Sequence, residues 1–445
     1  MGGVNNGLGN PPPGANLAAL RDHNAALVLG LLRDSGAAGA SRAELAARTG
    51  LTPQAVSKIC ARLRAAGLAA EAGRRASTGG KPATTWRLVP DAAHAIGLHL
   101  DRDALTTTLV DLTGTPVATR TAPLAFGAGA KALLDAVATE VAALLAEGDA
   151  GEGLTSGTAP AAVASPGAVG LRGGSPGSGA LAADTREGSS AAAPAAPTPP
   201  RARRPLLGVG VAVPGPLDHA SGVLHRVTGF PEWDGFPLRD ALAERLGMPV
   251  VVDKDTNAAA LGLVLRGAGG GGPAADSFAY LHLGTGLGAG LVLGGGVHRG
   301  ARTGAGEFGH QVLQLDGPPC PCGNRGCVEA LCLGAVAAGD TARAARLLGV
   351  GAANLVRLLD IDLVLLGGRT VLAEPEPYLR GVRAVLAEDA ARADGRTVPV
   401  AVTPGGGRTV VEGAAELALA PLFGRSGTAF TARSDETKIV TSGGM

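Results

Sequence analysis

The chain has 445 residues, which is enough for two or three domains with well-formed cores. Its formal net charge is +1, which excludes both an acidic solvating protein and a protein that is basic throughout. The charge is uneven, because residues 1–90 carry 11 Lys and Arg against 4 Asp and Glu, whereas the rest of the chain is mildly acidic. A basic first segment indicates a nucleic acid as its partner.

The start of the chain and its cysteine usage indicate where the protein resides. Residues 1–15 are rich in Gly, Pro and Asn, lack the basic and apolar regions of a signal peptide, and are expected to form a disordered leader. No run of eighteen apolar residues could span a membrane. Five cysteines, three of them clustered, do not make a secreted disulfide framework. We therefore expect a cytoplasmic protein with no membrane partner.

Three short helices are predicted in the basic segment. Residues Asn16–Arg33 have leucines at helical spacing. Ser41 and Glu44 form the capping box of a second helix, which stops at Gly50. Thr52 then caps a third helix, which begins with a proline at its first position. This helix–glycine–helix spacing is typical of a helix-turn-helix.

The third helix has polar side chains opposite its apolar face, and such side chains can contact base edges or phosphates. Residues 68–88 are predicted to form two short strands around a basic, glycine-rich tip, which is a wing that would lie along phosphates. Residues 16–90 are therefore predicted to be a winged helix-turn-helix that binds double-stranded DNA. The alternative is a three-helix protein-interaction module with a solvated basic loop. The predicted DNA contacts are Gln54, Ser57, Lys58 and Arg62 on the helix, and Arg74, Arg75 and Lys81 in the wing.

A segment of low complexity interrupts the rest of the chain. Between residues 151 and 200, 40 of 50 residues are Gly, Ala, Pro, Ser or Thr. Such a run buries too little apolar surface to offset its chain entropy. We interpret residues 148–205 as a disordered insertion within one domain, because strand-like sequence continues on both sides.

Residues 91–424 alternate between strand-like and helix-like segments, with glycine-rich loops between them. This pattern predicts an α/β body with two lobes around a cleft, and we expect the second lobe to open near residue 249. Residues 425–445 are polar and are expected to form a flexible tail. The predicted strands include residues 95–100, 105–112, 206–213, 249–252, 278–283 and 363–367.

Three cysteines and one histidine are clustered late in the chain, at His310, Cys320, Cys322 and Cys327. Three thiolates and an imidazole are the set that a structural Zn²⁺ prefers, in a closed tetrahedral site. The alternative is a loop of unrelated thiols, which the rarity of cysteine elsewhere disfavours. The sequence therefore predicts a structural zinc site.

Seven motifs stand out along the chain, namely STGGKPAT, VAVPGPLD, VDKDTNAAALG, LGTGLGAGLV, GEFGH, CPCGNRGCVEAL and LVLLGG. Together they resemble those of the repressor–ORF–kinase (ROK) family, and in particular its transcriptional repressors. The resemblance covers about residues 20–423 without the insertion. It implies an actin/hexokinase-like ATPase fold for the body, as in sugar kinases, with a sugar bound between the lobes.

The resemblance also implies which side chains would hold the sugar. Asp255 stands where the family's kinases have their catalytic base, and Glu307, His310 and Glu329 would bind further sugar hydroxyls. His310 would serve the metal with one ring nitrogen and the sugar with the other. Carboxylates suit this work because each oxygen accepts two hydroxyl hydrogens. For Asp255 and Glu307 the alternative is solvated loop charge.

Two departures from the family pattern bear on function. The family's kinases have Asp-x-Gly-Gly-Thr as their first phosphate loop, where this chain has carboxylates at Asp101 and Asp103. The second loop, Gly284-Thr285-Gly286, survives, either as a vestigial phosphate loop or as a hairpin turn that the fold needs. Lys254 replaces the usual Asn before Asp255. This lysine either favours an acidic or phosphorylated sugar or points away from it.

These features predict a sugar-responsive DNA-binding regulator, a repressor of carbohydrate-utilisation genes, whose body senses a sugar without catalysis. We expect a homodimer or homotetramer, with coupling to the wings through the segment after Leu88. The alternative is an active ATP-dependent sugar kinase, similar to a glucokinase, with an accessory DNA-binding domain. A third option is control of the body by a protein partner.

Overall fold

The computed structural model describes residues 17–75, 83–150, 205–227, 229–266, 275–393 and 395–424. The predicted leader and tail lie outside these ranges, as do Lys81 and nearly all of the predicted insertion. Within the described ranges, no helix has the length and apolar character that crossing a membrane requires.

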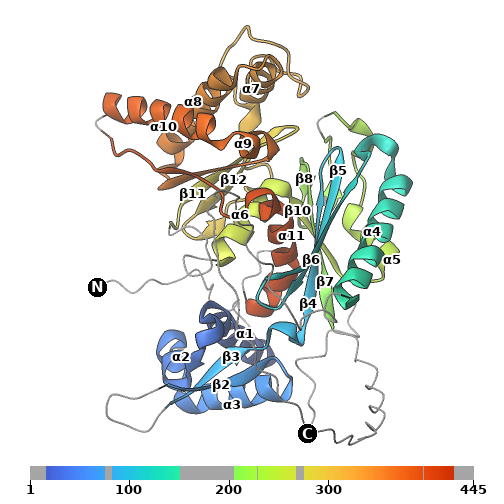
Figure 1. The fold of residues 1–445 in the computed structure, drawn as a ribbon, viewed down its shortest axis with the longest axis vertical. Coiled ribbons are helices and arrows are strands. Elements are labelled where there is room, and N and C mark those ends of the chain that lie inside the picture. The colour runs from blue at the N-terminus through green and yellow to red at the C-terminus, as the bar shows by residue number, and fades with distance from the viewer. Residues whose placement is uncertain are drawn as a thin grey trace, which may run out of the picture. The chain divides into compact units, whose positions relative to one another are not determined.

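Three helices and a three-stranded sheet form the N-terminal domain (Figure 1). Ser41 Oγ accepts a hydrogen bond from Glu44 N at 3.2 Å, and Glu44 Oε2 accepts one from Ser41 N at 2.7 Å, which is the predicted capping box. Thr52 Oγ1 caps the third helix at Ala55 N. The winged helix-turn-helix prediction is confirmed. Its elements are α1 (Leu17–Asp34), β1 (Ala40–Ser41), α2 (Arg42–Thr49), α3 (Pro53–Ala65), β2 (Ala69–Arg75) and β3 (Ala83–Leu88).

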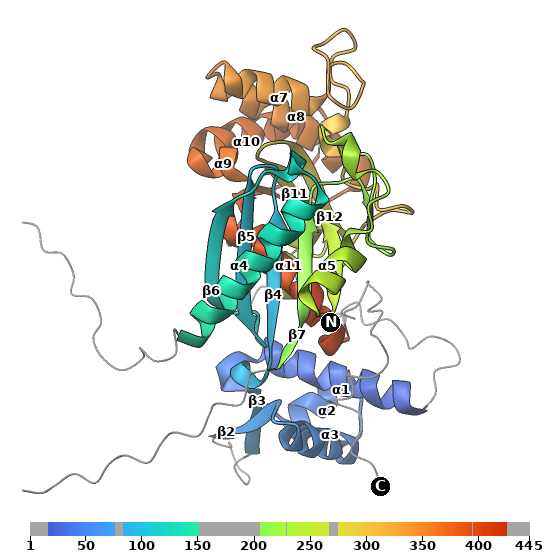
Figure 2. The ribbon, with the colours of Figure 1, turned by 90° about the vertical axis from the view of Figure 1, so that its right-hand side faces the viewer.

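The first lobe of the body is built on a five-stranded sheet in the order β10-β7-β4-β5-β6. Two helices, α4 (Ala130–Ala150) and α5 (Leu238–Leu246), pack against one face of this sheet (Figure 2). A separate pair, β8 (Leu217–Asp218) and β9 (Val223–Leu224), follows β7. The five strands are β4 (His94–Leu100), β5 (Ala104–Asp111), β6 (Pro116–Pro123), β7 (Leu206–Val213) and β10 (Val250–Lys254).

One expectation about this lobe is wrong. The strand near residue 249 does not open the second lobe, because β10 pairs in parallel with β7 and forms the edge of the first sheet. Periodicity locates a buried strand but does not identify its partner. Here the chain returns through α5, a crossover that places two parallel strands side by side.

The second lobe contains a five-stranded sheet in the order β13-β12-β11-β14-β15. Its apolar core is shared with α7 (Val328–Ala337), α8 (Thr341–Leu359) and α10 (Pro375–Arg392), while the short α9 (Arg369–Ala373) follows β14 (Figure 1). The strands are β11 (Phe278–Leu283), β12 (Leu287–Leu293), β13 (Gly296–Val297), β14 (Leu363–Gly367) and β15 (Val400–Val402).

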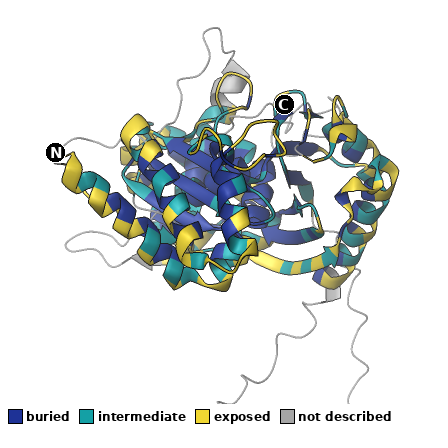
Figure 3. Cartoon of the chain, turned by 90° about the horizontal axis from the view of Figure 1, so that it is seen from above, coloured by how far each residue is buried: buried dark blue, intermediate teal, exposed yellow. Residues whose placement is uncertain are grey.

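Two helices, α6 (Asp255–Arg266) and α11 (Thr409–Leu419), join the lobes. They share one apolar cluster with strands of both sheets. Buried residues gather in the interior of the described chain, and exposed residues lie on its outer helices (Figure 3). A Cβ atom at Gly97 of β4 or Gly210 of β7 would overlap a carbonyl of α11, so glycine at both positions allows the helix to lie directly on the strands. The expected two-lobed α/β architecture is therefore present.

Candidate functional site

A cleft of about 630 Å³, part of it open to solvent, is lined by residues of both lobes. Asp255, Glu307, His310 and Glu329 all line it, although they lie up to 74 positions apart in the sequence. The structure therefore brings together the four residues predicted to hold a sugar. It also adds residues that sequence reasoning did not assign to a sugar, namely Arg102, Pro214, Gly215, Thr256 and His282.

Two of the four predicted sugar-binding residues, Asp255 and Glu329, lie in the first turns of helices. Asp255 is the first residue of α6, and its Oδ1 accepts a hydrogen bond from Thr256 N at 2.6 Å. Glu329 is the second residue of α7 and is only 5% exposed, and its Oε2 accepts from Leu287 N at 2.8 Å. A helix N-terminus favours a carboxylate, so both positions suit ionised side chains that still have oxygens to offer a ligand.

Lys254 lines the cleft. The alternative in which its side chain points away from the cleft is therefore wrong. Its side chain is 3% exposed, and its Nζ donates to Glu307 Oε1 at 2.9 Å and to Ala305 O at 2.6 Å. Glu307 is 40% exposed and keeps its second oxygen for other partners. A cation and an anion thus meet at this wall, and a hydroxyl group could donate to Glu307 while it accepts from Lys254.

Asp253 organises the backbone beneath this pair. It is fully buried, and its carboxylate accepts from Lys254 N at 2.8 Å, Asn257 Nδ2 at 2.9 Å and Arg299 Nε at 2.7 Å. A buried carboxylate needs this many partners because an unpaired one would be costly. Sequence reasoning did not single out Asp253, and Arg299 lies 46 positions away, so only the fold shows that the two pair.

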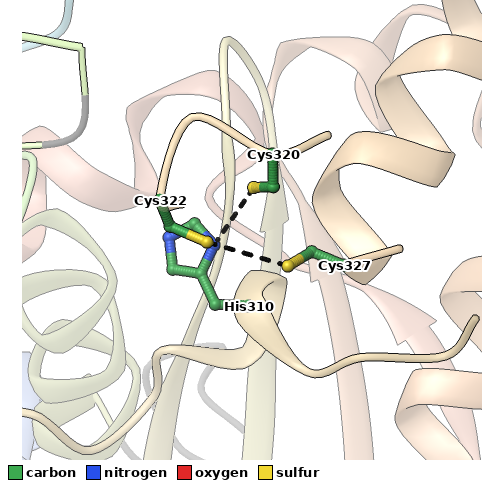
Figure 4. A group of neighbouring side chains, drawn as sticks. All are labelled: His310, Cys320, Cys322 and Cys327. Carbon is green, nitrogen blue, oxygen red and sulfur yellow. Dashed lines mark hydrogen bonds between the residues drawn. The ribbon is translucent and has the colours of Figure 1, made fainter. Parts of the chain in front are cut away.

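The predicted metal ligands converge at one point beside the cleft. His310 follows Glu307 in the short turn that leads into the cysteine loop, and Cys327 caps α7. The four ligand atoms lie within 4.8 Å of one another, as the side chains in Figure 4 show. His310 Nδ1 is 3.7 Å from Cys320 Sγ, and Cys322 Sγ is 3.7 Å from Cys327 Sγ.

These distances suit a tetrahedral metal ion. Sulfur atoms that each lie about 2.3 Å from one zinc ion are about 3.8 Å apart, which is close to the observed separation. With Nδ1 directed at the thiols, Nε2 of His310 remains for the cleft, which the imidazole also lines. The group could therefore bind a metal ion, and a bound ion would fix the orientation of a residue that faces the cleft.

The turn between β4 and β5 contains Asp101 and Asp103, the two carboxylates of the predicted first phosphate loop. Asp101 Oδ1 accepts from Arg102 N at 2.7 Å and from Thr285 Oγ1, in the opposite lobe, at 2.9 Å. Burial alone would raise the pKa of Asp101, but the charge of His99 and these two hydrogen bonds outweigh it and hold the pKa below its usual value. Burial lowers the pKa of His99.

The surviving glycine loop is the turn between β11 and β12, closed by a hydrogen bond from Gly284 N to Gly286 O at 2.9 Å. The hydroxyl of Thr285 is engaged by Asp101. An exposed ion pair between Asp103 and Arg369, at 2.8 Å, connects the same two lobes. The β4–β5 turn is thus bonded to Thr285 and Arg369 of the second lobe.

The predicted DNA contacts lie on α3 and β2. Gln54 and Lys58 are exposed, whereas Ser57 and Arg62 are half-buried, so Arg62 is less available than its helical position suggested. Arg74 and Arg75 end β2 at the start of the wing. The apolar face of α3 is buried as predicted, through Val56, Ile59, Cys60 and Leu63.

Comparison with known proteins gives the same two parts. The ROK family model matches residues 197–343, and the MarR family model matches residues 22–76. A glucokinase from Halalkalibacterium halodurans is 39% identical over 130 residues, which are 29% of this chain and 38% of that protein. A putative xylose repressor from Caldicellulosiruptor sp. is 37% identical over 130 residues, which are 29% of this chain and 32% of that protein.

The matched region thus spans less than two fifths of either relative. A solved structure of a ROK family transcriptional regulator, a homolog of the E. coli MLC protein, is also similar to this chain. The superposition covers 91% of this chain and 98% of that chain. Its TM-score is 0.65 at 19% identity, which is a likeness of fold that includes the N-terminal domain. The chain thus contains a region that matches the ROK family and, ahead of it, a winged helix-turn-helix region that matches the MarR family.

Proposed function

We propose that this chain is a sugar-responsive transcriptional regulator that binds DNA through its winged helix and senses a sugar in the interlobe cleft. The observation that carries this proposal is that the four side chains predicted to bind a sugar line one cleft, while the two turns predicted to be phosphate loops are bonded to each other. Asp255, Glu307, His310 and Glu329 line the cleft, and Asp101 accepts a hydrogen bond from Thr285. Such a cleft would suit a sugar and would lack the free backbone cradle that a nucleoside triphosphate requires.

Repression of carbohydrate-utilisation genes is the form of regulation we favour, because the relatives include xylose repressors. The protein would act in the cytoplasm as a homodimer or homotetramer, with two copies of α3 reading a pseudo-palindromic operator. Gln54, Ser57, Lys58 and Arg62 would contact the major groove, and Arg74, Arg75 and Lys81 would contact phosphates.

Zinc is the metal we propose for His310, Cys320, Cys322 and Cys327, because a Cys₃His set without a free position is typical of structural zinc. The ion would neutralise thiolate charge and hold His310 in place, while the chain's own residues bind the ligand. Its role is thus to shape one wall of the cleft.

An active sugar kinase is the rival function, and two observations favour it. Asp255 keeps the position of the kinases' catalytic base, and relatives named glucokinase match the same region. Against it stand the carboxylates at Asp101 and Asp103, which would repel an anionic triphosphate.

Two assays on the purified protein test the proposal. Operator sequences are selected from random DNA duplexes, and their binding is then measured by fluorescence anisotropy with and without a panel of pentoses, hexoses and amino sugars, xylose and glucose first. A coupled assay measures ADP formation with the same sugars. We expect one sugar to release the operator and none to support turnover. Robust sugar-dependent ADP formation, or an absence of selected operators, would contradict the proposal.

A further inference from the structure

Helix α11 is buried along its whole length, yet it carries two glutamates in its interior. All eleven residues from Thr409 to Leu419 are buried, with Glu412 at 4% exposure and Glu416 at 1%. A carboxylate at such depth requires a cationic partner, and in both cases the partner comes from a different part of the fold. The two glutamates lie one helical turn apart.

Glu416 pairs with Arg33, which lies in the last turn of α1 in the DNA-binding domain. Arg33 Nη1 is 2.8 Å from Glu416 Oε2, and Nη2 contacts the other carboxylate oxygen, so the pair is bidentate. The guanidinium also donates to Thr113 O at 3.1 and 2.8 Å and lies over the ring of Phe423, 4.9 Å from its centroid. Each of these side-chain contacts of Arg33 reaches the body rather than its own domain.

Glu412 pairs with Arg266, the last residue of α6, and with Arg408 Nε at 2.8 Å. The first residue of α6 is Asp255, which lines the cleft together with Thr256. Helix α6 thus extends from the cleft to the ion pair on α11.

The two helices also touch through their backbones. A Cβ atom at Gly413 would overlap the carbonyl group of Ala258, and one at Gly262 would meet Gly413 Cα. No side chain separates the helices at this point, so a displacement of α6 cannot be absorbed by rotamer changes and must move α11.

The other end of α11 belongs to the core of the DNA-binding domain. Ala415, Ala418 and Leu419 share one apolar cluster with residues of α1, α3 and β3. The helix therefore contacts the sugar-site helix on one side and the recognition domain on the other.

We propose that α11 transmits the state of the cleft to the DNA-binding domain, with the Arg33–Glu416 pair as the connection to α1. The inference rests on the proposed function and specifies its regulation. It places the coupling in α11 as well as in the covalent segment that links Leu88 to β4.

The test replaces both members of the pair with apolar residues, Arg33→Met with Glu416→Leu, because removing one member alone would leave a buried charge. A matched control, Arg396→Met with Asp362→Leu, removes an ion pair of 2.7 Å whose side chains are 65% and 47% exposed. The operator dissociation constant is measured with and without the sugar that releases wild type. Sugar affinity without DNA is measured by calorimetry.

In the double variant we expect sugar affinity to be retained, while the factor by which sugar weakens operator binding, typically 5–150-fold in allosteric proteins, falls to about twofold or less. The control should keep the wild-type factor. A double variant that binds both ligands and keeps the full factor would overturn the inference.

Hydrogen exchange of the wild-type protein gives a second reading that does not depend on how the variant folds. Sugar should change amide exchange in α11 and in the last turn of α1, and unchanged exchange in both would overturn the inference. If no sugar in the panel weakens operator binding by wild type, the proposed function itself is wrong, and the inference falls with it. The two failures are therefore distinguishable.

Discussion

At the scale of single residues, the wall formed by Lys254 and Glu307 decides which ligand the cleft can accept. Asp101, Asp255, Glu307 and Glu329 outnumber the cations among the cleft-lining side chains. The one buried lysine is already paired with Glu307. The site therefore suits an uncharged sugar whose hydroxyl groups both donate and accept, rather than a strongly anionic one.

Replacement of Lys254 by Met should weaken sugar binding by about tenfold or more, because a hydrogen bond to a charged group is worth about 1.5–3 kcal/mol. Glu307 would remain solvated, so the fold should survive. Isothermal titration calorimetry measures the affinity. Lys131→Met, at a lysine with 93% exposure, is the control, and equal affinities in the two variants would contradict the assigned role.

Replacement of Cys322 by Ser should remove most of the metal, because a structural zinc site needs all four of its ligands. Elemental analysis by mass spectrometry should find about one zinc ion per wild-type chain and much less in the variant. Cys60→Ala, in the core of the N-terminal domain, should keep the metal. Undiminished zinc in Cys322→Ser would contradict the ligand assignment.

At the scale of elements, the turns β4–β5 and β11–β12 bond the two lobes to each other through Asp101 and Thr285. The exposed pair of Asp103 and Arg369 adds little, since surface ion pairs contribute about 0–1 kcal/mol. The partly buried hydrogen bond between Thr285 and Asp101 is therefore the stronger of the two contacts at this edge of the cleft.

Thr285→Val should destabilise the protein by about 1–2 kcal/mol, because it leaves the half-buried carboxylate of Asp101 without its hydroxyl donor. The folded-state pKa of Asp101 is depressed, so its contribution is complete above its unfolded-state pKa, about 3.9, and is lost as the pH falls through the lower folded-state pKa. The difference between wild type and variant in urea unfolding should therefore shrink in acid. Thr106→Val, at a half-buried strand threonine whose hydroxyl contacts Thr121 rather than a carboxylate, should show no such pH dependence.

The recognition helix α3 presents Lys58 to solvent while its opposite face is buried. Lys58→Ala should weaken operator binding by about tenfold and, if the lysine contacts a phosphate, reduce the slope of log affinity against log salt by about 1. Anisotropy titrations at several salt concentrations measure both. Arg245→Ala in the body is the control, and an unchanged salt slope together with full affinity would place Lys58 outside the interface.

At the scale of the whole molecule, the cleft and the DNA-binding domain are joined by buried elements rather than by a linker. Helix α11 packs against α6, β4 and β7 and shares a core with α1. A shared core of this kind favours discrete alternative packings over continuous deformation. Binding of a ligand at one site is therefore expected to change the affinity of the other site for its own ligand.

Linkage makes this expectation quantitative, because the factor by which sugar weakens operator binding must equal the factor by which operator weakens sugar binding. Anisotropy titrations measure the factor by which sugar weakens operator binding. Calorimetry of sugar with the free protein and with the operator complex measures the factor by which operator weakens sugar binding. Unequal factors would show that sugar acts through a change of oligomeric state or another coupled equilibrium.

Local sequence was sufficient to predict the elements and chemical groups whose physics is short-range. The capping box of Ser41 and Glu44, the cluster of possible metal ligands that includes His310 and Cys327, and the carboxylate at Asp101 all depend on neighbours or on composition within a few residues. Family resemblance added the predicted sugar-binding set, which no periodicity could reveal.

Only the tertiary structure decided the interactions between distant residues. It placed β10 in the first sheet, bonded Asp101 to Thr285 across 184 positions, and paired Arg33 with Glu416 across 383. Each of these contacts depends on how helices and sheets pack. The separation of two residues along the sequence does not show whether they are close in space. The physical reason is that packing, rather than local propensity, selects the partner of a buried strand or a buried charge.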